Sequence, residues 1–184
     1  MPQQLILPPK RQGGTILFVV LITMLVLMIS SVGMIRSFDT SIGLASNLAF
    51  KRDLSNQAER GIASALALIN AGTLGDSNIN TSNYSASMLA SDAQGIPLAI
   101  MSNTTFTSTG FSGTDITDAS SGVVIRTVID RQCRVTGSPN MLTDCAFINV
   151  GTETDPNYQV VYRITSRATG PKNTQVFLQS IASR

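Results

Sequence analysis

The longest apolar segment of the chain lies near its N-terminus, where residues 15–35 carry no charged side chain. At about 1.5 Å per residue, a helix of this length spans about 30 Å, the thickness of a bilayer's hydrocarbon core. Lys10 and Arg11 precede the segment, and Arg36 and Asp39 follow it. By the positive-inside rule, this pattern predicts one membrane span with a cytoplasmic N-terminus.

Beyond the span, apolar residues recur at three- and four-residue steps, which predicts that the helix continues to about residue 70 with one apolar stripe. No proline occurs between residues 10 and 96, and Gly72 provides a stop signal. The stripe contains Ile42, Ala45, Leu48, Ala49, Ala58, Ile62, Ala65, Leu66 and Ile69. Something in the fold must cover its apolar side chains.

The last third of the chain shows an alternating pattern instead. It predicts four strands, at residues 123–131, 146–150, 158–167 and 174–182, with a turn at 170–173. An antiparallel sheet of about four strands could cover the helix stripe with one face. We therefore expect an α+β fold in which the long N-terminal helix packs on a C-terminal antiparallel sheet.

Residues 72–122 are rich in Ser, Thr, Asn and Gly. We expect a variable loop region on the surface, with one short helix near 85–92 and one short strand near 97–101. The expected organisation is a leader, a transmembrane half-helix, an amphipathic half-helix, this loop region, and a sheet with a disulfide loop. Their respective ranges are 1–14, 15–35, 36–71, 72–122 and 123–184.

The amino-acid composition excludes several classes of function. The chain has no histidine, which removes the commonest general base and zinc ligand. Without the leader, which contains Lys10 and Arg11, the chain has 11 basic and 11 acidic side chains. It therefore lacks the excess of positive charge with which proteins bind nucleic acid. Nucleophile elbows, phosphate-binding glycine loops and clustered acids are missing from the sequence. We expect no enzymatic activity, no cofactor and no metal.

The two cysteines, Cys133 and Cys145, flank a turn-rich stretch containing Gly137, Ser138, Pro139 and Asn140. Free thiols would be expected in a cytosolic protein, but an exported chain meets an oxidising compartment. We predict a disulfide, which in the chain-entropy model stabilises the fold by about 3 kcal/mol.

Small residues, Gly13 and Gly14, come before the apolar segment. A cleaved secretory signal would carry its small-residue site after that segment. The observed order suits a peptidase that cuts on the cytoplasmic face and leaves the apolar segment on the mature protein. A plain signal anchor is the alternative.

The segment RQGGTILFVVLITMLVLMISSVGMIRS, followed by Ala45-Ser46-Asn47, resembles the start of type IV prepilins and pseudopilins, most closely the PilX group of minor pilins. The resemblance covers residues 10–70 well and the C-terminal strands loosely. The chain departs from the group at Ser46, where a glycine is usual, and at Arg60-Gly61, where alanines are usual. An acidic pair usual before Ala45 is also missing.

This resemblance implies a type IV pilin-like fold, cleavage by prepilin peptidase between Gly14 and Thr15, and N-methylation of Thr15. Gly13 offers a second cleavage site. Major pilins carry a glutamate at the fifth position after the cut, which pairs with a neighbour's amino terminus; here that position is Val19. A subunit without this acid can receive the next subunit through Thr15 but cannot be drawn beneath a previous one, which implies a place at the fibre tip.

The implied function is therefore that of a minor pilin that primes type IV pilus assembly. The implied partners are other minor pilins, the major pilin, a tip adhesin-like protein, the inner-membrane assembly platform and prepilin peptidase. The protein would lie in the bacterial inner membrane with a periplasmic C-terminal domain, and then on the pilus. A minor pseudopilin of a type II secretion system and a signal-anchored periplasmic binding domain are the alternatives.

Overall fold

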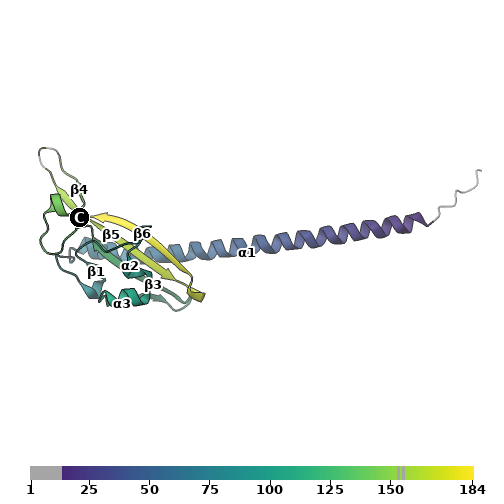
Figure 1. The fold of residues 1–184 in the computed structure, drawn as a ribbon, viewed down its shortest axis with the longest axis horizontal. Coiled ribbons are helices and arrows are strands. Elements are labelled where there is room, and N and C mark those ends of the chain that lie inside the picture. The colour runs from purple at the N-terminus through teal and green to yellow at the C-terminus, as the bar shows by residue number, and fades with distance from the viewer. Residues whose placement is uncertain (1–13, 153, 155) are drawn as a thin grey trace, which may run out of the picture. The chain divides into compact units, whose positions relative to one another are not determined.

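The computed structural model describes residues 14–152, 154 and 156–184. Its first element is α1 (Thr15–Ala71), one uninterrupted helix of 57 residues, shown in purple to blue in Figure 1. The helix predicted over 15–70 is confirmed. It ends where Gly72 adopts a φ of +70°, which glycine accepts without a Cβ penalty. The boundary between the chain's two compact units falls within α1, after Leu48, and each unit is described by itself.

In the first unit, every residue from 14 to 48 is exposed. Its only charged side chains among the described residues belong to Arg36 and Asp39. The part of α1 near the N-terminus is long and apolar enough to cross a membrane. This agrees with the predicted span.

The second unit contains a mixed sheet of six strands, which corrects the expected antiparallel sheet of about four. Its centre is the antiparallel pair β3 and β5, and β5 also pairs antiparallel with β6 and β4. β2 joins β3 antiparallel, whereas β1 joins it in parallel. The bounds are β1 Tyr84–Ser85, β2 Ile116–Asp118, β3 Val123–Arg131, β4 Phe147–Asn149, β5 Tyr158–Thr169 and β6 Gln175–Ser183. The four predicted strands thus correspond to β3–β6, and the short η2 (Pro171–Asn173) occupies the predicted turn.

The segment predicted as a surface loop is instead a packed layer. Residues 85–92 are not helical, and residues 97–101, predicted as a strand, contain the helix α2 (Leu98–Met101). The other elements here are η1 (Asn80–Ser82), β1, β2 and α3 (Asn103–Ser108). α3 begins with a capping box in which Ser102 and Thr105 satisfy each other's backbone N–H groups. Phe106 and Phe111 pack with Val128 and thereby cover the second face of the sheet.

The C-terminal part of α1 packs on the first face. Leu54 and Ala58 contact Val123 and Ile125, and further along the helix a second cluster joins Ile62, Ala65 and Ile69 to the sheet. The predicted stripe residues Ile42, Ala45, Leu48 and Ala49 stay exposed. The contact with the sheet unit ends at Phe50 and Leu54, which lie against Gly170 in the turn after β5.

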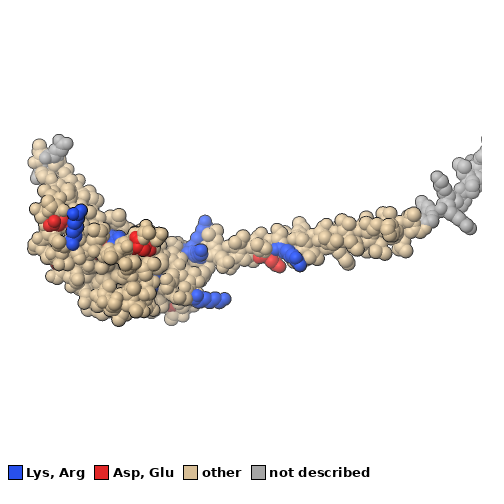
Figure 2. Space-filling view, viewed as in Figure 1, with Lys and Arg blue, Asp and Glu red and all other residues tan. Residues whose placement is uncertain are grey.

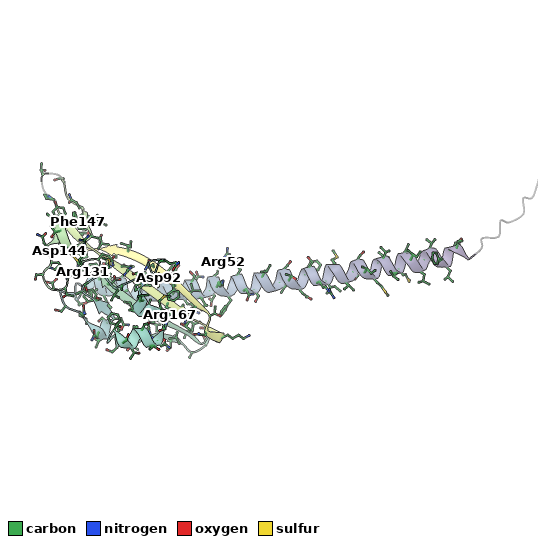
Figure 3. All side chains as sticks on the ribbon, in the orientation of Figure 1. Arg52, Asp92, Arg131, Asp144, Phe147 and Arg167 are labelled. Carbon is green, nitrogen blue, oxygen red and sulfur yellow. A yellow bond between two sulfur atoms is a disulfide. The ribbon has the colours of Figure 1, made fainter. Side chains whose placement is uncertain are left out.

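Charged side chains are sparse on the visible surface of the second unit (Figure 2). Arg52 extends from α1 into solvent, whereas Arg131 and Arg167 lie within the folded unit (Figure 3). Both of these arginines are only 4% exposed. Because a buried charge must be paired or hydrogen-bonded, these residues mark where the fold is held by polar contacts.

Candidate functional site

The residues predicted for processing lie at the start of α1. Gly14 directly precedes the helix and has no atom within 4 Å of the Cβ position it lacks. Thr15 is the first helical residue, and Val19 is 56% exposed one turn later. Gly13 and the rest of the predicted leader lie outside the described residues. The cleavage and methylation positions therefore remain predictions on an exposed helix start.

Hydroxyl groups within the apolar part of α1 bond back to the helix itself. The Thr23 hydroxyl donates to the Val20 carbonyl at 2.8 Å, and the Ser30 hydroxyl donates to the Val26 carbonyl at 2.9 Å. Such bonds satisfy polar side chains without water, which a lipid environment requires. The exposed surface of this segment is therefore compatible with hydrocarbon.

No carboxylate lies near Val19 in the described part of the helix. The first acidic residue of α1 is Asp39, 24 residues beyond Thr15, or about 36 Å along the helix axis. Residues 15–38 of the helix therefore offer no carboxylate to a neighbouring molecule.

The second predicted site is the disulfide loop. Cys133 and Cys145 form a disulfide, and the two residues also make an antiparallel β-bridge. The predicted bond is confirmed. It belongs to the second unit, whereas Gly14, Thr15 and Val19 belong to the first.

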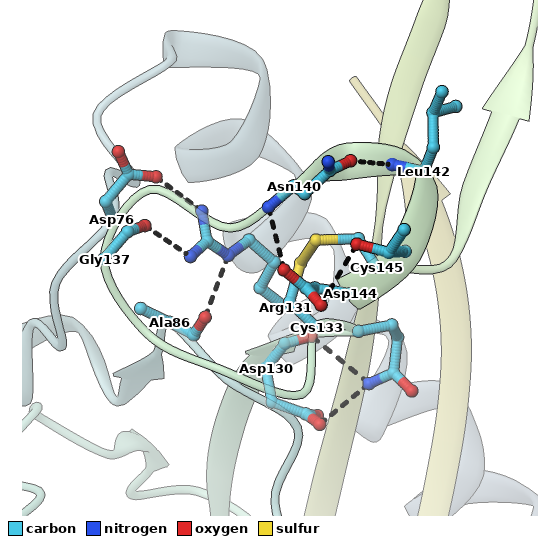
Figure 4. The surroundings of a disulfide bond; sticks show 12 residues. Asp76, Ala86, Asp130, Arg131, Cys133, Gly137, Asn140, Leu142, Asp144 and Cys145 are labelled. Carbon is cyan, nitrogen blue, oxygen red and sulfur yellow. Dashed lines mark hydrogen bonds and ion pairs between the residues drawn. A yellow bond between two sulfur atoms is a disulfide. The ribbon is translucent and has the colours of Figure 1, made fainter.

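Arg131 anchors this loop to the segment that follows α1 (Figure 4). Its guanidinium donates to the Gly137 carbonyl at 3.1 Å, to the Ala86 carbonyl at 2.8 Å and to the Asp76 carboxylate at 2.6 Å. The Gly137 N–H in turn donates to the Asp76 carbonyl at 2.8 Å. One buried arginine thus connects three chain segments next to the disulfide.

Inside the loop, two side chains cap the N-terminal end of the short helix α4 (Met141–Asp144). The Asn140 side chain accepts the Leu142 N–H at 3.0 Å, and the Asp144 carboxylate accepts the Asn140 N–H at 2.9 Å (Figure 4). These bonds order the loop locally, as caps do for isolated turns.

A buried ion pair lies in the centre of the sheet. Asp130, which is fully buried, accepts two hydrogen bonds from Arg163, at 2.9 Å and 2.7 Å. Arg163 also donates to the carbonyls of Leu89 and Gly95. The pair therefore holds residues 89–95 against the sheet through charge-assisted bonds.

Burial also shifts the pKa values of side chains in this unit, among them Tyr84 and Arg167. Desolvation raises the pKa of Tyr84 to about 12, and its hydroxyl donates to the Gly75 carbonyl at 2.8 Å. Desolvation, followed by the neighbouring Arg126 charge, lowers the pKa of Arg167. In the described structure the Arg167 Nε has no hydrogen-bond partner, although its other nitrogens bond to the Ile100 carbonyl and Asn103.

A pocket of about 300 Å³ lies between α1, residues 81–83 and β3. Its floor includes Ala65, Leu68 and Ile125, and its lining side chains are all uncharged. The polar side chains of the lining are the Asn83 amide and five hydroxyl groups, which belong to Ser64, Thr81, Ser82, Thr114 and Thr127. The pocket has the size of a small ligand site but offers only neutral hydrogen-bonding groups.

The sequence patterns did not predict a role for four charged residues, Asp76, Asp130, Arg131 and Arg163. A signal existed for two of them, because Asp130 and Arg131 interrupt the apolar end of a strand with adjacent charges. Their partners lie 33 and 55 positions away along the chain, so no local pattern could have identified them. Comparisons of the chain with family models, curated proteins and solved structures found no match.

Proposed function

We propose that the protein is a minor pilin that primes assembly of a type IV pilus. The observation that carries the proposal is α1: one 57-residue helix that is exposed and apolar at its start and packed on a sheet at its end. Such a helix can lie in the membrane before assembly and among neighbouring helices afterwards. The sheet unit then remains outside the helix core.

Val19 supports a place at the tip. A carboxylate at this position would pair with the amino terminus of a neighbouring subunit, and an unpaired carboxylate in a bilayer is costly. With valine there, the subunit recruits the next one through Thr15 but is not recruited beneath another. Its proposed partners are other minor pilins, the major pilin, a tip adhesin-like protein, the assembly platform and prepilin peptidase. Adhesion and twitching motility would follow from the fibre.

Mass spectrometry of the membrane-extracted protein tests the processing step. The expected product begins at a methylated Thr15. A chain that still begins at Met1 in cells with active prepilin peptidase would contradict both pilin-type functions and favour a signal-anchored binding domain. The neutral pocket between α1 and β3 would then be the first place to look for a ligand.

A minor pseudopilin of a type II secretion system has the same helix and the same processing. Deletion of the gene distinguishes the two functions. A pilin predicts the loss of surface fibres with normal protein secretion, whereas a pseudopilin predicts the reverse.

The tip position is tested by Val19→Glu, with Val20→Glu as the matched control on the next helix position. Immunogold labelling should find the Val19→Glu protein along the length of the fibre, while the control, whose acid faces a different direction, should not spread along it. Val19→Glu protein found at the tip alone, with normal initiation, would show that the missing acid does not place the subunit.

A further inference from the structure

Strand β6 forms an open edge of the sheet. In the described part of the chain it pairs only with β5, and Figure 1 shows it in yellow alongside that strand. Each of its nine residues is exposed or half-buried. Its sequence, QVFLQSIAS, contains none of the charged residues or prolines with which proteins usually protect such an edge.

The register with β5 identifies the backbone groups that face outward. Val160 and Arg184 exchange both backbone hydrogen bonds, at 2.9 Å and 3.1 Å, and the pairing continues without a bulge to Thr169 and Gln175. In an antiparallel pair, hydrogen-bonded and outward-facing residues alternate. The N–H and C=O groups of Phe177, Gln179, Ile181 and Ser183 therefore face away from the sheet.

Apolar surface borders this edge on both faces. Towards α1, a groove of about 430 Å³ is lined by Ile62, Leu66 and Leu178, and the exposed Glu59 also contributes to it. On the opposite face, the Ile181 side chain is 69% exposed. A strand added to β6 would place alternate side chains into the groove and the others over Ile181, as in other complexes formed by strand addition.

We propose that β6 receives an extended segment of another polypeptide as a seventh strand. Its residues facing the groove are apolar, and one near Glu59 is basic. A second copy that pairs through its own β6 does not fit, because Gln175–Ser183 contains no basic residue to place near Glu59. This proposal rests on the open edge of the sheet, and it does not depend on a role of the protein in a pilus.

Photocrosslinking residues at Gln175 and Ile181, introduced singly into the full-length protein in its own membrane, test the register. The two side chains lie six positions apart on one face of β6. If a strand is added, mass spectrometry of the products will place the two crosslinks about six residues apart in a single segment of one partner. Crosslinks that are scattered, confined to lipid, or located in β6 of a second copy would overturn the proposal.

A matched pair of variants tests the backbone contact in the same experiment. Gln179→Pro and Gln179→Thr both remove the side-chain bonds to the Gly95 carbonyl and Thr165, but only proline also removes the outward N–H. We expect crosslinking to fall about fivefold with proline relative to threonine, the effect of one backbone hydrogen bond. Equal crosslinking in both variants would overturn strand addition. The Cys133–Cys145 disulfide reports whether the proline variant folds. If the variant does not form this bond, the spacing of the crosslinks in the protein without a substitution at Gln179 decides for or against strand addition.

Discussion

Tyr84 and Asp130 are polar residues that the sheet unit buries completely. Each is satisfied by specific partners, Tyr84 by the Gly75 carbonyl and Asp130 by Arg163, Leu89 and Gln132. A buried polar group costs little while its partners are present and much when one is removed. Stability should therefore be sensitive to single atoms at these two positions.

Tyr84 gives the fold a dependence on alkaline pH. Its pKa is about 12 in the folded state and about 10 in the unfolded state, so between these values only the unfolded state releases the proton. The contribution of Tyr84 to the free energy of unfolding is therefore fully present below pH 10 and is lost as the pH rises through 12. Tyr84→Phe should lower the free energy of unfolding by about 1 kcal/mol at pH 7, through the lost hydrogen bond.

The same variant should lose less stability than the parent between pH 7 and pH 11, by about 1 kcal/mol, because phenylalanine has no proton to release. Urea denaturation of both proteins in detergent at the two pH values measures the difference. Tyr162, whose pKa burial also raises, is present in both and cancels. An equal decrease in the free energy of unfolding of the two proteins would contradict the raised pKa of Tyr84.

Asp130→Asn keeps the size of the side chain but leaves the Arg163 charge buried without a counterion. The free energy of unfolding should fall by about 3 kcal/mol. Asp53→Asn, on the exposed face of α1, is the control and should change it by less than about 0.5 kcal/mol. Similar effects of the two variants on the urea midpoint would show that the buried pair is not a major support of the sheet.

At the scale of elements, α1 and the sheet are in close contact at Gly61. A Cβ atom there would clash with the Thr127 hydroxyl oxygen and would lie 2.5 Å from that of Ser166. Glycine lowers helix stability by about 1 kcal/mol relative to alanine. Its presence at the contact therefore reflects packing rather than helix propensity.

Gly61→Ala should destabilise the second unit by about 2 kcal/mol despite the better helix propensity of alanine, because helix and sheet must separate. Gly43→Ala, where a Cβ meets no atom within 4 Å, is the matched control and should be neutral or stabilising. Thermal unfolding monitored by circular dichroism compares the two. A stabilising effect at both positions would mean that the close contact is easily relaxed.

At the scale of the whole molecule, the two units differ in what surrounds them. The second unit has its own core on both faces of a sheet, whereas residues 14–48 form an exposed apolar helix. An apolar surface of this size on a monomer requires a membrane or a partner to cover it. Membrane attachment should therefore depend on the apolar character of residues 15–35.

Replacement of both Ile22 and Leu25 by arginine should release the protein into the alkaline-carbonate supernatant. Two central arginines cost about 6 kcal/mol of insertion free energy, which is comparable to the whole gain from the segment. The matched control, Ser37→Arg with Ser41→Arg, places the same charges beyond the span and should stay in the pellet. A pelleted Ile22/Leu25 variant would argue against a simple membrane span.

Much of the molecule follows from local sequence patterns. The bounds of α1, the positions of β3–β6 and the turn at 170–173 agree with the sequence because periodicity and glycine placement act within a few residues. The Cys133–Cys145 bond was also predictable, since the chain between the cysteines is short and rich in turn residues. The assembly role, in contrast, depends on a resemblance of residues 10–70 and stays a proposal.

Other features were decided only by tertiary structure. The parallel pairing of β1, the packing of residues 98–111 on the second face, and the start of helix coverage at Phe50 all depend on contacts between distant segments. The same is true of the pairs Asp76–Arg131 and Asp130–Arg163. A sequence pattern shows which side chains are apolar or charged, but the free energy of a contact depends on which distant residue the fold brings against them.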